Sequence, residues 1–242
     1  MFRRAIQLAS LMIPGVLGCA GSVTGARPSD MSQEEHKAAA ASEQQEATEH
    51  ANKYDPKALT VIDDCTQYLG SCWGSNPTEG HNKQAEQHRR AAEAHAGAAR
   101  VLGDAETRAC QGVSEADRDM SPFLHREAIS EVKALTRMVN GPLDTTYGGG
   151  ERAVEEPAGA TIVLLPAAGV TAERLERIVQ CHIARNAALG NNLQDMPLCP
   201  LVPKGVSATV TSNGNGFAVN ISGADKATAA EILRRAQALS HS

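Results

Sequence analysis

The sequence predicts an α+β protein, in which an N-terminal, alanine-rich helical hairpin precedes a C-terminal domain with the element order βαββα. Residues 32–109 contain two long stretches dominated by Ala, Glu and Gln, which are good helix formers and predict the hairpin. Residues 160–240 combine an apolar run, two amphipathic helical patterns and two segments of alternating apolar and polar residues. These patterns predict the second domain.

The N-terminus predicts an exported chain. Arg3 and Arg4 precede an apolar run over residues 5–18, which is shorter than the about 20 residues of a membrane span. The Val-Leu-Gly-Cys sequence of residues 16–19 resembles the lipobox of bacterial lipoproteins. This resemblance implies a lipoprotein signal peptide over residues 1–18 and acylation of Cys19. The alternative is a secreted protein that is cleaved elsewhere.

A lipid anchor at Cys19 would attach the chain stably to a membrane, because several acyl chains bind the membrane firmly, whereas a single acyl chain binds it only weakly. Ala20 follows the cysteine, and by the sorting rule of that family this implies the outer membrane, facing the periplasm. Residues 19–31 contain Gly, Ser, Thr and Pro and predict a flexible tether. The net charge of −5, without basic runs, argues against nucleic-acid binding.

The two helices of the hairpin have clear start signals. Ser32 and Glu35 form a capping-box pattern that opens a helix, which the Tyr-Asp-Pro sequence at 54–56 ends at Lys53. Asn76 followed by Pro77 predicts the start of a second helix, which runs to about residue 109. Because alanine lets helix backbones approach closely, we expect the two helices to pack as a hairpin within residues 32–128.

The connector between these helices carries Cys65 and Cys72. Since the periplasm oxidises thiols, a disulfide that closes this short loop is the leading interpretation. A metal site is the alternative, but no third and fourth ligand lies at close spacing. Of the six cysteines, five remain after Cys19, so at least one thiol has no partner within the chain.

Three histidines, His81, His88 and His95, recur every seven residues on the second helix. A metal-binding or pH-sensing stripe is one interpretation. The interpretation that we favour is a solvated polar face. Seven residues of helix separate two side chains by about 10 Å, which is too far for one metal ion to bind both.

The domain over residues 129–242 begins with an ambiguous segment. Residues 129–139 suit neither period cleanly, and we expect a strand there, followed by a loop over residues 140–159. Residues 161–165 predict a buried strand, and Thr171 caps a helix that ends at Gly190.

Two alternating segments, residues 206–211 and 217–221, then flank an Asn-Gly turn, and Asp225 or Ser222 caps a final helix. The resulting βαββα order resembles a ferredoxin-like plait, as in small metal-carrier domains. Those carriers bind metal through a Cys-x-x-Cys loop after their first strand. Residues 166–170 contain no cysteine, so this activity does not carry over.

Four phrases of the sequence, at residues 54–56, 109–114, 121–127 and 181–190, are similar to a group of uncharacterised bacterial lipoproteins. The similarity covers most of the mature chain. It implies an exported lipoprotein and no particular activity.

The densest set of reactive side chains is Cys181, His182 and the nearby Cys199. The helical phase places His182 on the apolar face, where a buried and hydrogen-bonded core residue is the expected role. A disulfide between Cys181 and Cys199 would pin the following loop to the helix and leave Cys110 as the odd thiol. An enzyme would need a base at informative spacing, which the sequence lacks.

A soft-metal site is the alternative interpretation of these residues. Cys110, Cys181 and Cys199, with His182 or His125, would suit Cu(I) or Zn(II). Neighbouring helix residues point about 100° apart, so Cys181 and His182 do not readily bind one ion together. We therefore expect a lipid-anchored envelope protein with a binding or structural role, no cofactor and an envelope protein as possible partner. A Cu- or Zn-binding lipoprotein is the alternative.

Overall fold

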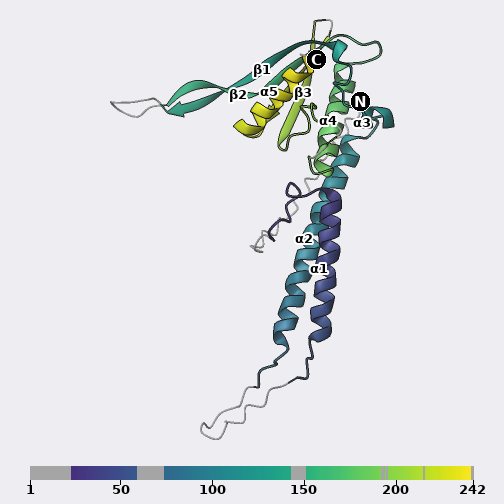
Figure 1. The fold of residues 1–242 in the computed structure, drawn as a ribbon, viewed down its shortest axis with the longest axis vertical. Helices are drawn as coiled ribbons and strands as arrows, with labels where there is room; N and C mark the ends of the chain where they lie inside the picture. Colours follow the sequence, from purple (N-terminus) through teal and green to yellow (C-terminus); the bar gives the residue numbers. More distant parts are fainter. Residues whose placement is uncertain are drawn as a thin grey trace, which may run out of the picture.

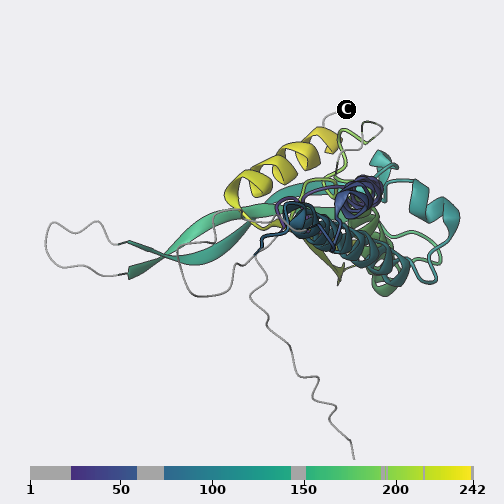
Figure 2. The ribbon, with the colours of Figure 1, turned by 90° about the horizontal axis from the view of Figure 1, so that it is seen from below.

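The computed structural model of the protein describes residues 23–58, 74–142, 151–191, 194, 196–214 and 216–240. Two long helices, α1 and α2, run side by side away from a body that contains a four-stranded sheet and the remaining helices (Figure 1). The view from below shows α1 and α2 nearly end-on, with a two-stranded ribbon reaching out to one side (Figure 2). The mixed helix-and-sheet class predicted from the sequence is confirmed.

α1 spans Gln33–Lys53 and α2 spans Glu79–Ala109. The predicted capping box is present, because the Ser32 hydroxyl accepts a hydrogen bond from the Glu35 backbone N–H, and the Glu35 carboxylate accepts one from Ser32. α2 begins two residues later than Pro77 predicted. The Asn76 side chain instead accepts from the Thr78 N–H at 2.7 Å and closes a turn before the helix.

α2 is the longer helix and extends beyond α1. Its C-terminal part packs against α4, which spans Ala172–Ala188. With 31 residues it is about 46 Å long, at about 1.5 Å of rise per residue. α2 therefore connects the far end of the helix pair to the body without a break. Among the described residues, none of the helices is both long enough and apolar enough to cross a membrane.

The sheet contains β1 (Ile129–Pro142), β2 (Glu151–Leu164), β3 (Val206–Asn213) and β4 (Gly216–Gly223). Its strands are all antiparallel and lie in the order β1-β2-β4-β3. The short helices α3 (Glu115–Asp119) and η2 (Arg126–Ala128) connect α2 to β1. The predicted strand over residues 129–139 is thus confirmed.

The predicted loop over residues 140–159 is wrong in part, because β2 begins at Glu151 and Pro142 pairs with Glu151. The sequence did not predict this part of the strand because it contains Pro157 and Gly159, which disfavour strands. β4 pairs with β2 only from Gly159 onward, so Pro157 lies where β2 is an edge strand and its missing N–H costs little. Gly159 has φ +151, and a Cβ there would meet the Ile221 carbonyl oxygen. Only glycine fits this position.

α4 and α5 (Lys226–Ser240) supply apolar side chains to the same core as the sheet. β4 alternates as predicted, with Phe217, Val219 and Ile221 buried. The predicted cap of the last helix is Asp225 rather than Ser222, because its carboxylate accepts from the Thr228 N–H at 2.8 Å. The fully buried residues of this core include Ile162, Val179, Val219, Ile221, Ile232 and Ala236.

The structure describes the predicted tether from residue 23 onward. Hydrogen bonds close turns from Ala26 to Val23 and from Asp30 to Arg27, and the Arg27 carbonyl contacts the ring of His36. Residues 23–31 are therefore turns packed near the start of α1. Cys19, Cys65 and Cys72 lie outside the described residues, and so does the disulfide predicted for the connector.

Candidate functional site

A seam of small and polar residues joins α1 to α2. Its members recur every three or four residues on each helix, which places them on one face, as in a coiled coil. None of these members is a large apolar residue. The members on α1 are His36, Ala40, Glu43, Ala47 and His50, and those on α2 are His81, Ala85, His88, Ala92, His95 and Ala99. Alanine brings the helices close, and polar pairs fill the alternate layers.

Three polar pairs cross the seam. Nδ1 of His36 lies 3.1 Å from Nδ1 of His95. The Glu43 carboxylate accepts from Nδ1 of His88 at 2.7 Å, and Nδ1 of His50 lies 3.0 Å from Nδ1 of His81. Successive pairs are seven residues apart on both helices, running in opposite directions, so the helices are antiparallel and share one register.

The His36–His95 pair is the most buried, with exposed fractions of 0% and 5%. Nε2 of His36 donates to the Arg27 carbonyl at 3.0 Å. In a neutral His36 ring Nδ1 must then be the acceptor, and His95 donates to it. This pair connects the residues before α1 to both helices.

The His50 layer is more open and contains more ligand atoms. The His50 ring stacks on His88, with centroids 5.5 Å apart and planes inclined by 6°. Glu46, one turn before His50 on α1, brings its carboxylate within 4.8 Å of a ring nitrogen of each histidine. Among the described residues, this is the one group of three that could hold a metal ion.

The solvated polar face predicted for His81, His88 and His95 is therefore wrong, because these side chains face α1. The spacing argument holds on α2 alone, where each histidine occupies its own layer. The missing partners come from α1, where His36, Glu43 and His50 have the same seven-residue period. Comparing the periods of both helices would have found the seam in the sequence.

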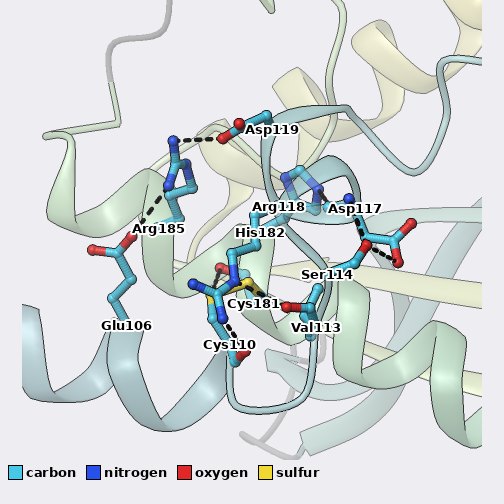
Figure 3. The surroundings of a disulfide bond; sticks show 10 residues. All are labelled: Glu106, Cys110, Val113, Ser114, Asp117, Arg118, Asp119, Cys181, His182 and Arg185. Carbon is cyan, nitrogen blue, oxygen red and sulfur yellow. Dashed lines mark hydrogen bonds and ion pairs between the residues drawn. A yellow bond between two sulfur atoms is a disulfide. The ribbon is translucent and has the colours of Figure 1, made fainter.

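The body contains a disulfide between Cys110, at the end of α2, and Cys181 in α4 (Figure 3). The predicted Cys181–Cys199 disulfide is wrong, and Cys199 rather than Cys110 is the free thiol among the described cysteines. Cys181 packs with Cys110 and Val113, away from the core that holds Cys199. The loop does return to α4, but it meets Asn186, whose amide donates to the Leu201 carbonyl at 3.0 Å.

His182 is the buried core residue that the helical phase predicted, with 1% of its surface exposed. Its Nε2 donates to the Asp117 carbonyl at 2.8 Å. Burial lowers the pKa of His182, and the backbone carbonyls of Asp117 and Met120 act in the opposite direction. The His182 ring therefore links α4 to α3 through this hydrogen bond.

Two arginines complete the junction around the disulfide (Figure 3). Arg118 donates to the carbonyls of Cys110 and Val113. Arg185 of α4 pairs with Glu106 of α2 at 3.5 Å and with Asp119 at 2.8 Å. A covalent bond and these pairs therefore fix α2, α3 and α4 to one another.

The predicted soft-metal set is not assembled. Cys110 and Cys181 are bonded to each other and offer no thiolate. Burial raises the pKa of the Cys199 thiol, which keeps it protonated. His125 is exposed beside Glu127, and His182 is held by a backbone carbonyl.

Two apolar hollows flank the segment that follows α3. One of about 350 Å³ lies toward Met196 and Leu239, and one of about 250 Å³ lies toward Leu165 and Phe217. Met120 and Leu124 line both hollows and are about half exposed, at 46% and 55%. Exposed apolar side chains around a hollow are typical of a contact surface.

Neither a protein-family model, nor a curated protein, nor a solved structure matches this chain.

Proposed function

We propose that the protein is a lipid-anchored protein of the bacterial envelope with a binding or structural role. The observation that carries this proposal is the buried Cys110–Cys181 disulfide, since such bonds persist in oxidising compartments and are rare in the cytosol. The lipobox-like sequence that ends at Cys19 supports attachment to the outer membrane, on its periplasmic face.

In this proposal the α1–α2 pair is a helical hairpin that serves as a rigid arm on the body. The end of α1 is held beside the start of α2, because the Asn76 amide donates to the Asp55 carbonyl and Thr78 Oγ1 accepts from the Asp55 N–H. At the other end the disulfide and Arg185 tie α2 to the body. An arm whose helices are joined at the far end and fixed to the body at the other end suits a spacer or a scaffold.

The body in this proposal is a ferredoxin-like domain. Its strands β2, β4 and β3 are adjacent in that order, with the α4 and α5 side chains in one shared core. The fourth strand, β1, precedes the unit in the chain and lies beside β2. The hollows lined by Met120 and Leu124 are where an envelope protein partner would make contact.

The test is acylation in a bacterial host that exports lipoproteins. Cells that express the full chain are grown with radiolabelled palmitate, and the labelled protein is partitioned between detergent and water. We expect label on the wild type, which enters the detergent phase, and none on Cys19→Ser. An unlabelled wild type that stays in the aqueous phase would contradict the proposal.

A further inference from the structure

We propose that Glu46, His50 and His88 bind one divalent transition-metal ion of the Zn²⁺ class at the α1–α2 seam. Each residue offers a ligand atom, and the three atoms lie within 4.8 Å of one another. Two imidazoles and a carboxylate are the donor set of many Zn²⁺ sites, which leave a fourth position for water. This site is separate from the cysteines and does not depend on the lipid anchor.

The helical geometry aims the three side chains at one point. Glu46 and His50 are four residues apart on α1, so they lie on the same face one turn apart. His88 faces them from α2, and its ring stacks on that of His50. Ligand atoms on a tetrahedral Zn²⁺ ion are about 3.4 Å apart, given bonds of about 2.1 Å. Side-chain rotation alone can therefore close the group on an ion.

The neighbouring seam residues orient the two imidazoles. Glu43 accepts from Nδ1 of His88, which leaves Nε2 of His88 for the metal. Nδ1 of His50 lies 3.0 Å from Nδ1 of His81, which is an imidazole rather than a carboxylate. A carboxylate that holds the other nitrogen of a metal-binding histidine fixes the tautomer and raises its basicity. Glu43 and His81 thus hold Nδ1 of each imidazole and leave each Nε2 for the ion.

Access and space also suit an ion. Glu46 is exposed, and His50 and His88 are half-buried, so the site opens to solvent on one side. The buried neighbours along the seam are alanines, with Ala47 2% and Ala85 1% exposed. These alanines bring the two helices close, so ligands from α1 and from α2 can reach one ion.

The His36–His95 layer of the same seam can be compared with the proposed metal site. Both ring nitrogens of His36 are engaged, one by His95 and one by the Arg27 carbonyl. Within the described residues, that layer forms no three-residue group able to hold a metal. The proposal therefore predicts metal binding between the adjacent layers of His50 and His88, and none at the His36–His95 layer.

The experiment is a Zn²⁺ titration of the metal-free full chain in detergent, in competition with a chromophoric chelator and with excess Mg²⁺ present. We expect one Zn²⁺ per chain, because Mg²⁺ prefers oxygen ligands and does not compete for imidazole. A wild-type chain that takes no Zn²⁺ from the chelator would overturn the proposal.

Variants locate the ion. His50→Gln and His88→Gln should weaken binding by more than the about 10- to 100-fold expected for Glu43→Gln, which removes only the carboxylate that holds Nδ1 of His88. Glu46→Gln is decisive because Glu46 is exposed and its loss leaves the helices packed, as circular dichroism will verify. Zn²⁺ affinity unchanged in Glu46→Gln and His88→Gln would overturn the assignment.

Two controls complete the set. His125→Gln changes an exposed histidine outside the seam and should leave Zn²⁺ affinity unchanged. His95→Gln changes the other layer and should do the same wherever helix content is retained. A loss in His125→Gln equal to that in His88→Gln would show that the ion binds elsewhere.

Discussion

His182 couples the stability of the fold to protonation. Burial lowers the pKa of His182, with Arg185 adding to this effect and Asp117 opposing it. The unfolded chain therefore binds the proton at a higher pH than the folded protein does. Stability is full above the unfolded pKa of about 6.5 and is lost as the pH falls below it.

Because the pKa of His182 is lowered in the folded protein, we predict that the free energy of unfolding, measured in urea, decreases from pH 7 to pH 5. His182→Gln removes the titrating ring, so its stability should change less over the same range. The difference between the two curves isolates His182 from the other histidines. Parallel curves would show that the His182 ring does not titrate differently in the folded protein.

Cys199 shows why the thiol pairing could not be predicted from the sequence. Its distance from Cys181 along the chain allowed a disulfide, and the loop does return to α4. The pairing instead depends on which side of α4 each residue faces, and Cys181 faces the end of α2. A contact between residues 71 positions apart leaves no local signal.

At the scale of elements, the seam shows how two helices pair with little apolar surface. Alanines bury few atoms each, so the apolar contribution per layer is small at about 25 cal/mol per Å². Breaking a polar pair there leaves a buried donor or acceptor without a partner. The layers of His36 and His95, and of Glu43 and His88, therefore set the register.

We predict that His36→Ala destabilises the α1–α2 pair by about 1–3 kcal/mol, the cost of an unsatisfied buried polar group. His95→Ala should cost a similar amount. The double variant should cost less than the sum, because the two rings are each other's partners. Thermal unfolding followed at the helical circular dichroism signal measures all three.

His125→Ala is the matched control, since an exposed histidine should change stability by at most about 0.5 kcal/mol. Strictly additive effects of the His36 and His95 substitutions would contradict the pairing.

Local signals predicted several elements correctly. The Ser32 capping box and the alternation of β4 are short-range patterns, and both are present. The packing of residues 23–31 beside α1 and the start of β2 could not be predicted in this way. The first depends on the contact between the Arg27 carbonyl and His36, and the second on the pairing of residues 151–157 with β1.

At the scale of the whole molecule, α2 is the one element that belongs to both the arm and the body. It packs on α1 along the seam and on α4 beyond it. The Cys110–Cys181 disulfide closes a loop of 71 residues, which the loop-entropy model values at about 4 kcal/mol. We expect this bond to hold the arm in one position on the body.

Replacing both cysteines by alanine should therefore lower the free energy of unfolding of the full chain by about 2–5 kcal/mol. Cys199→Ala is the comparison, because it removes a buried thiol without removing a crosslink. Urea unfolding without reductant measures both variants. Equal losses in the two would show that the bond adds nothing beyond the packing of the sulfur atoms.

The most direct test is peptide mass spectrometry of the full chain after export by a bacterial host, alkylated and digested without reductant. The structure predicts a linked pair of peptides that contain Cys110 and Cys181, with Cys199 carrying the alkyl group. A linked pair that contains Cys181 and Cys199, or alkylation of both Cys110 and Cys181, would contradict an arm fixed covalently to the body.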